Sequence, residues 1–179
     1  LNRPLLDVYV MEIPRDMEVS CLYPPQRDLQ IRQTADPEAR LERYAVWKLL
    51  EKAAWRTFNL KMEDIRFSQE KGKWTCDKFS FSLSHSRGAV AVAVSNGSCG
   101  VDLENRDHFL AGRDMEPFPR HFLQRMCTPR ERALVREPRD LMDLWTKKEC
   151  LFKGYGSGGF FSRKTDTFAR KTETRSVTL

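Results

Sequence analysis

The chain has 179 residues, enough for one domain of ordinary size or for two small lobes that share a core. Hydrophobic residues make up 40% and charged residues 31%, a balance that excludes an intrinsically disordered chain. The formal net charge of +6 suits an anionic partner, such as a polyphosphate cofactor, an acidic protein or nucleic acid, and equally fits a solvated basic surface with no partner. The Lys and Arg residues form no continuous block, which argues against a nucleic-acid-binding protein.

Cysteine usage and hydropathy indicate the compartment. The five cysteines contain no C-x-x-C pair, which argues against a disulfide framework and a zinc site and favours a reducing compartment. The longest apolar run, residues 89–94, is too short to span a bilayer, and no signal segment opens the chain. We therefore expect a cytoplasmic protein that does not contact membranes.

The first part of the chain predicts one strand and one long helix. Residues 5–13 alternate loosely between apolar and polar side chains, which predicts a strand, and a proline-containing loop follows. Asp36 and Pro37 are a good helix start, because aspartate caps a helix and proline fits its first position. The helix should continue to about Asn59.

Short strands are predicted next, over residues 64–68 and 79–83. Residues 89–95 and 98–104 flank the pair Asn96-Gly97. An Asn-Gly pair between two β-rich runs is the strongest short hairpin signal in a sequence. We therefore expect residues 89–95 and 98–104 to pair as a hairpin.

The second half is predicted to be mostly helical, which makes the fold class α+β. Residues 118–126 form one segment, and Thr128 with Glu131 predicts a capping box that opens another. A third helix should cover residues 138–153 and stop at the glycines from Gly154 onward. The tail, residues 162–179, is polar, with one strand expected near its end.

Two acidic residues and one histidine are candidates for phosphate chemistry. On a strand, Asp102 and Glu104 would point to the same face, and Mg²⁺ commonly separates two such carboxylates beside phosphate substrates. Taken alone, the same pattern also fits two solvated acids on an edge strand. His85, between Ser84 and Ser86 at the end of a strand, would either donate to a phosphate or satisfy a backbone carbonyl.

A third candidate lies on the last predicted helix. Glu149 and Lys153 are four residues apart and therefore face the same way. Taken alone, they fit a surface ion pair whose neighbours Trp145 and Phe152 lie in the core.

Together, three segments in order resemble the 4′-phosphopantetheinyl transferase superfamily. They are F-S-L-S-H-S ending at Ser86, C-G-V-D-L-E ending at Glu104, and W-T-K-K-E-C-L-F-K ending at Lys153. The family signatures are a Ser-His-Ser strand end, a Gly-(Val/Ile)-Asp-x-Glu strand and a Trp-(Ser/Thr)-x-Lys-Glu-x-x-x-Lys helix. The Glu-x-Gly-Lys segment of the larger members also has a counterpart at residues 70–73. The resemblance covers about residues 40–158.

The resemblance implies a magnesium-dependent reaction and assigns its residues. Asp102, Glu104 and Glu149 match the magnesium-binding acids, and Lys153 matches the helix lysine that faces the phosphates. It implies that a carrier-protein serine attacks the β-phosphate of coenzyme A and that adenosine 3′,5′-bisphosphate leaves. Glu149, directly or through water, or else Glu131, would take the serine proton, and Lys153 would stabilise the leaving phosphate.

The resemblance also assigns contacts to coenzyme A. His85, with Ser84 in the same motif, matches a contact to a coenzyme A phosphate, and Lys73 matches a second contact. Either Arg40 or Arg43 would hold the 3′-phosphate.

The family fold implies two similar α/β lobes related by a pseudo-two-fold axis, each a small antiparallel sheet packed with a long helix. We expect lobes at residues 1–95 and 96–179 with the active site between them, as in the larger, surfactin-synthetase-activating members, and a monomer. The chain departs from the family at Trp74, where proline is common, and after Gly159. A non-catalytic module that binds coenzyme A or a carrier protein is the alternative, and a nucleic-acid-binding domain has only the charge in its favour.

Overall fold

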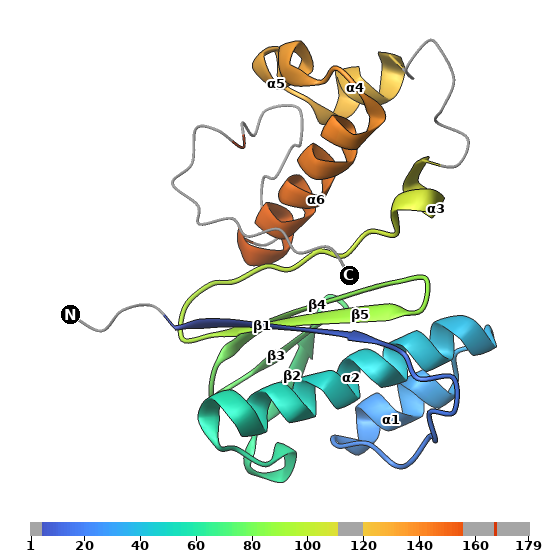
Figure 1. The fold of residues 1–179 in the computed structure, drawn as a ribbon. Coiled ribbons are helices and arrows are strands. Elements are labelled where there is room, and N and C mark those ends of the chain that lie inside the picture. Colours follow the sequence, from blue (N-terminus) through green and yellow to red (C-terminus); the bar gives the residue numbers. More distant parts are fainter. Residues whose placement is uncertain (1–4, 111–119, 156–166, 168–179) are drawn as a thin grey trace. The chain divides into compact units, whose positions relative to one another are not determined.

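The computed structural model describes residues 5–110, 120–155 and 167, and the chain divides into two units. The first unit is Leu1–Leu103 and the second is Glu104–Leu179. The helices of both units and the small antiparallel sheets of the first unit confirm the α+β class (Figure 1). The pseudo-two-fold symmetry, the lobes 1–95 and 96–179 and the active site between them stay predictions. In the described ranges, no helix combines the length and apolarity that crossing a membrane requires.

The first unit contains a three-stranded antiparallel sheet in the order β1-β5-β4 (Figure 1). Its strands are β1 (Leu6–Glu12), β4 (Ser80–Ser86) and β5 (Ala89–Ser95). The central strand β5 reads AVAVAVS, so its valines line one face and its alanines the other. A two-residue turn joins β4 to β5, and both Arg87 and Gly88 in it have positive φ.

Helix α2 (Pro37–Phe58) packs against the valine face of β5, in line with the expectation of a long helix packed on a small antiparallel sheet. The Asp36 side chain accepts hydrogen bonds from two backbone N–H groups of the first turn, and Asn59 ends the helix in a left-handed conformation. Trp47 lies on α2 and is fully buried, and its indole N–H donates to the carbonyl oxygen of Tyr23. Capping and apolar periodicity are both local signals, which explains why both ends were predicted correctly.

Three elements before β4, namely the helix α1 (Pro25–Arg32), the short 3₁₀ turn η1 (Met62–Asp64) and the strand β3 (Lys73–Cys76), were not predicted. Helix α1 occupies part of the expected loop and buries only Ile31, so its sequence carries little helical periodicity. Strands β2 (Phe67–Glu70) and β3 form a second antiparallel sheet, which follows η1. The predicted strand at 64–68 therefore begins later, at Phe67.

The predicted hairpin across Asn96-Gly97 is wrong, because β1 and β4 already occupy both edges of β5. Residues 98–104 form no strand, and residues 99–103 instead cross the alanine face of the sheet. There the backbone N–H groups of Val101 and Leu103 donate to the Ser82 and Ser84 hydroxyls, each at 3.1 Å. Asp102 and Glu104 are therefore not neighbours on one face of a strand.

The second unit is helical in its described part (Figure 1). Its helices are α3 (Arg106–Leu110), α4 (Arg120–Met126), α5 (Pro129–Leu134) and α6 (Pro138–Tyr155). The capping box of α5 is confirmed, whereas the short helix α3 was not predicted. Helix α6 begins at Pro138 as predicted and continues through Gly154 to Tyr155, two residues beyond the predicted end. The predicted strand in the tail lies outside the described residues.

Candidate active site

Ser84 connects the Ser-His-Ser strand end to the segment that carries Asp102. Its buried hydroxyl donates to Asp102 Oδ1 at 3.1 Å and accepts the Leu103 backbone N–H at 3.1 Å. A hydroxyl has one proton and two lone pairs, so it can make both contacts at once. The carboxylate of Asp102 is therefore held beside the end of β4, although no ladder pairing brings it there.

Glu104 is held in a similar way within the second unit. The indole Nε1 of Trp145, on α6, donates to Glu104 Oε1 at 2.9 Å. These residues belong to two of the sequence motifs and are 41 positions apart. The tryptophan of the helix motif thus orients an acid of the Asp-x-Glu motif.

Helix α6 carries the other two candidate residues. Leu141, Leu144, Lys148 and Leu151 form its buried stripe. Glu149 and Lys153 are partly buried beside this stripe, one helical turn apart. Their spacing agrees with the prediction that both face the same way.

Glu131 is buried in an ion pair that the sequence did not predict. Glu131 Oε2 lies 2.8 Å from Lys148 Nζ, and the two side chains are 0% and 1% exposed. The same carboxylate accepts hydrogen bonds from the Thr128 N–H and from the N–H and hydroxyl of Thr167. Burial raises the pKa of Glu131, but the contact with Lys148, together with the hydrogen bonds from the two threonines, outweighs it, so the pKa lies below the ordinary glutamate value. Such a saturated, ionised carboxylate favours a structural role over that of a general base.

His85 has a carboxylate partner on α2. His85 Nδ1 lies 2.7 Å from Glu42 Oε2, and Glu42 Oε1 accepts the Gly88 N–H at 3.2 Å. Glu42 was not among the predicted site residues. No local signal identifies it, because it is 43 positions from His85 in the sequence.

The two candidate arginines lie close together at the start of α2. Arg40 Nε donates to the Thr34 carbonyl oxygen at 2.9 Å, and Arg43 Nη1 donates to the Thr34 hydroxyl at 3.0 Å. A third arginine, Arg27 on α1, stacks over the Trp47 ring at 5.0 Å from its centroid.

Arg27 is the second residue that the sequence analysis missed. Its Nε is buried and has no hydrogen-bond partner within the described part of the chain. Burial, together with the charge of Arg43, lowers the pKa of Arg27 to about 10. A bound anion would provide the missing acceptor and offset the repulsion between the two guanidinium groups.

Lys73 begins β3, directly after the hairpin turn at Lys71 and Gly72. It is exposed and lies opposite Glu70 in the β2–β3 ladder. The neighbouring Trp74, where the resembling family commonly has proline, donates Nε1 to Gln30 Oε1 and packs edge-on against Trp47. The tryptophan at this position therefore contributes to the packing of the first unit.

The three candidate metal ligands have suitable chemistry, since Mg²⁺ prefers carboxylate oxygens. Within residues 5–110, 120–155 and 167, no three His, Cys, Asp or Glu side chains are grouped closely enough to hold a metal ion. Asp102 belongs to the first unit, whereas Glu104 and Glu149 belong to the second. The three carboxylates thus fit Mg²⁺ chemically, and we propose below that they come together in one site.

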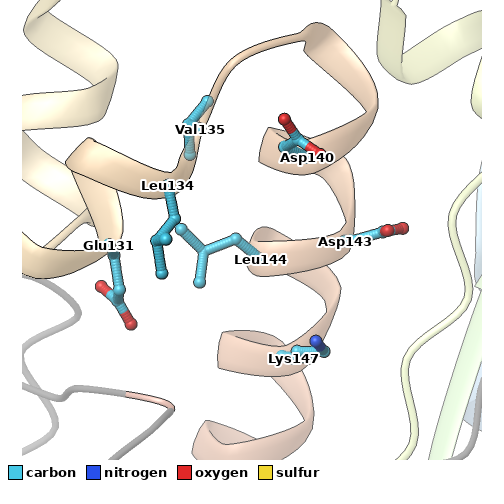
Figure 2. Close-up of a pocket in the computed structure, with 7 residues that line it drawn as sticks. All are labelled: Glu131, Leu134, Val135, Asp140, Asp143, Leu144 and Lys147. Carbon is cyan, nitrogen blue, oxygen red and sulfur yellow. The ribbon is translucent and has the colours of Figure 1, made fainter.

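A small pocket of about 150 Å³ lies between α5 and α6 (Figure 2). Leu134 and Leu144 point toward each other across it. Its lining residues are Glu131, Leu134, Val135, Asp140, Asp143, Leu144 and Lys147. Sites for small molecules usually enclose about 300–1,000 Å³, so this pocket does not fit a molecule as large as coenzyme A.

Comparison with protein families matches residues 98–177 to the 4′-phosphopantetheinyl transferase superfamily. The match contains five of the candidate residues, Asp102, Glu104, Glu131, Glu149 and Lys153. No curated protein matches the chain. The resemblance is therefore confirmed for a superfamily domain at residues 98–177, which indicates phosphopantetheine transfer in general.

Proposed function

We propose that the protein transfers the 4′-phosphopantetheine group of coenzyme A to a serine of an acyl or peptidyl carrier protein. The observation that carries this proposal is the superfamily match at residues 98–177, whose two acid-bearing motifs are joined by the Trp145–Glu104 hydrogen bond. Adenosine 3′,5′-bisphosphate is the second product. We further propose a two-lobed cytoplasmic monomer of the surfactin-synthetase-activating type.

Asp102, Glu104 and Glu149 would hold one Mg²⁺, which neutralises pyrophosphate oxygens when bound. Ser84 and Trp145 would orient two of these metal ligands through hydrogen bonds. Ser84 donates to the carboxylate of Asp102, and Trp145 donates to that of Glu104. Hydrogen bonds of this kind orient metal ligands and reduce the reorganisation that binding requires.

In the proposed reaction, a bond forms between the carrier serine oxygen and the β-phosphorus of coenzyme A. The bond from that phosphorus to the oxygen shared with the nucleotide breaks. Glu149 accepts the serine proton, directly or through water, because the contacts of Glu131 leave that carboxylate saturated. Lys153 stabilises the negative charge on the leaving phosphate.

Basic residues of the first unit would bind the coenzyme A phosphates. We assign the 3′-phosphate to the group of Arg27, Arg40 and Arg43. The buried Arg27 guanidinium costs free energy as long as its Nε has no acceptor, and a bound phosphate would provide that acceptor. His85 and Lys73 would contact the remaining phosphates.

Removal of the 3′-phosphate tests the arginine assignment. Arg43→Gln is expected to weaken coenzyme A binding about tenfold, because a charge-assisted hydrogen bond contributes ~1.5–3 kcal/mol. The same substitution should have little effect on dephospho-coenzyme A, which lacks this phosphate. Calorimetric titration of wild type, Arg40→Gln, Arg43→Gln and Arg27→Gln with both ligands shows which substitution weakens binding only when the 3′-phosphate is present. Equal losses with the two ligands for all three variants would remove this group from the 3′-phosphate site.

Lys153→Met separates catalysis from helix stability. We expect a large fall in kcat, little change in melting temperature, and a smaller effect on coenzyme A affinity than on rate. A surface lysine in an i,i+4 pair would instead contribute only about 0.3–0.5 kcal/mol to the helix. Carrier-labelling kinetics beside thermal unfolding provide the measurement. A variant that labels at the wild-type rate contradicts the catalytic role.

Incubation with fluorescent coenzyme A and a panel of apo carrier proteins tests the function itself. Covalent labelling of a carrier serine supports the transferase. Coenzyme A binding without labelling of any carrier would support the alternative of a non-catalytic binding module. Salt-dependent oligonucleotide binding without affinity for coenzyme A would instead support a nucleic-acid-binding domain.

A further inference from the structure

Glu42 lies in the second turn of α2 and bridges two parts of the β4–β5 hairpin. One carboxylate oxygen lies 2.7 Å from His85 Nδ1, and the other accepts the Gly88 N–H at 3.2 Å. The Glu42 side chain is 12% exposed, whereas that of His85 is 38% exposed. The carboxylate is thus mostly enclosed, while the imidazole remains open to a ligand.

The backbone around His85 is also held in place. Gly88 has a φ of +83° in the two-residue turn, and its carbonyl oxygen accepts the Ile13 N–H at 2.7 Å. Both backbone polar groups of Gly88 are therefore bonded to other parts of the unit, one to α2 and one to the segment after β1. The imidazole projects from a strand end that has little freedom to move.

The contact with Glu42 determines which ring nitrogen carries a proton. An ionised carboxylate can only accept a hydrogen bond, so Nδ1 must be the donor. Nε2, on the opposite side of the ring, is then the nitrogen that can contact a ligand. To donate to a phosphate oxygen as well, the ring must also carry a proton on Nε2, so that in the complex the imidazolium lies between the Glu42 carboxylate and the phosphate.

We infer that Glu42 is the positioning residue of His85, which directs Nε2 of the imidazole toward a phosphate of coenzyme A. The inference rests on the proposed function, in which His85 contacts that cofactor. Glu42 itself touches no substrate and acts only through the ring and the turn.

The charge of Glu42 makes the inference testable by the sign of an effect. If Glu42 were merely an acid near the binding site, its removal would strengthen the binding of anionic coenzyme A. If it positions His85, its removal should weaken binding in spite of the gain in positive charge. Glu38→Ala is the matched control, because Glu38 is an exposed acid one turn earlier on the same helix.

Coenzyme A titrations and histidine ¹⁵N spectra of the full chain provide the two measurements. We expect Glu42→Ala to bind coenzyme A roughly tenfold more weakly, as for the loss of a charge-assisted hydrogen bond, and Glu38→Ala to bind as well as wild type or better. The chain has three histidines, and His85→Gln identifies the His85 signals. In ligand-free wild type we expect His85 to carry its proton on Nδ1, and in Glu42→Ala to shift toward protonation of Nε2.

Glu42→Gln keeps a hydrogen-bond acceptor and should lie between wild type and Glu42→Ala in both measurements. Unchanged or tighter coenzyme A binding by Glu42→Ala, or an unchanged His85 spectrum, would overturn the positioning role. Failure of wild type itself to bind coenzyme A would reject the proposed function instead, and the spectra of the ligand-free protein would still report whether Glu42 sets the tautomer of His85.

Discussion

Asp102→Asn is expected to lower the rate of carrier-protein labelling by about 10²–10³, the usual cost of losing an electrostatic stabiliser at a reacting centre. The substitution removes the negative charge of the proposed magnesium ligand. The asparagine oxygen can still accept the Ser84 hydrogen bond that Asp102 Oδ1 accepts at 3.1 Å, so folding should be preserved. Labelling kinetics at several magnesium concentrations, beside thermal unfolding, measure both effects.

Asp107→Asn is the matched control for Asp102→Asn. Asp107 is exposed in the first turn of α3, and its substitution by asparagine changes the net charge by the same amount. We expect it to label carriers at the wild-type rate. Near wild-type turnover by Asp102→Asn with magnesium present would mean that the metal-ligand assignment is wrong.

Lys148→Met is expected to lower the free energy of unfolding by about 3–5 kcal/mol, because it leaves the buried Glu131 carboxylate without its counter-ion. The double variant Glu131→Gln/Lys148→Met should regain much of that loss. A glutamine at 131 carries no charge and can still complete the capping box with Thr128. Urea denaturation of wild type, both single variants and the double variant gives the coupling energy of the pair. Additive effects of the two substitutions would contradict a coupled ion pair.

The pH dependence of the same variants provides a second check. The folded-state pKa of Glu131 lies below its ordinary value of 4.5, so its ionised form contributes stability above that pH. The contribution is lost as pH falls through the lower folded-state pKa. The difference in unfolding free energy between wild type and Lys148→Met should therefore narrow below pH 4.5.

Local chemistry explains the predictions that the structure confirms. Asp36, Pro37 and Asn59 mark the ends of α2 through interactions within a few residues, as Thr128 and Glu131 do for α5. The three motifs were recognised for the same reason, since each is a short pattern of residue types. Glu149 and Lys153 lie one turn apart because helix geometry alone determines that spacing.

The sequence by itself thus determined the α+β class, the positions of α2, α5 and α6, and the resemblance that the superfamily match confirms for residues 98–177. Only the tertiary structure decided the path of residues 98–104, because the hairpin signal at Asn96-Gly97 contains no information that distant β1 occupies the free edge of β5. Tertiary structure likewise decided the partners of His85, Glu131 and Arg27. Those contacts join residues that are far apart in the chain, and the free energy of burying or pairing a charge depends on everything packed around it.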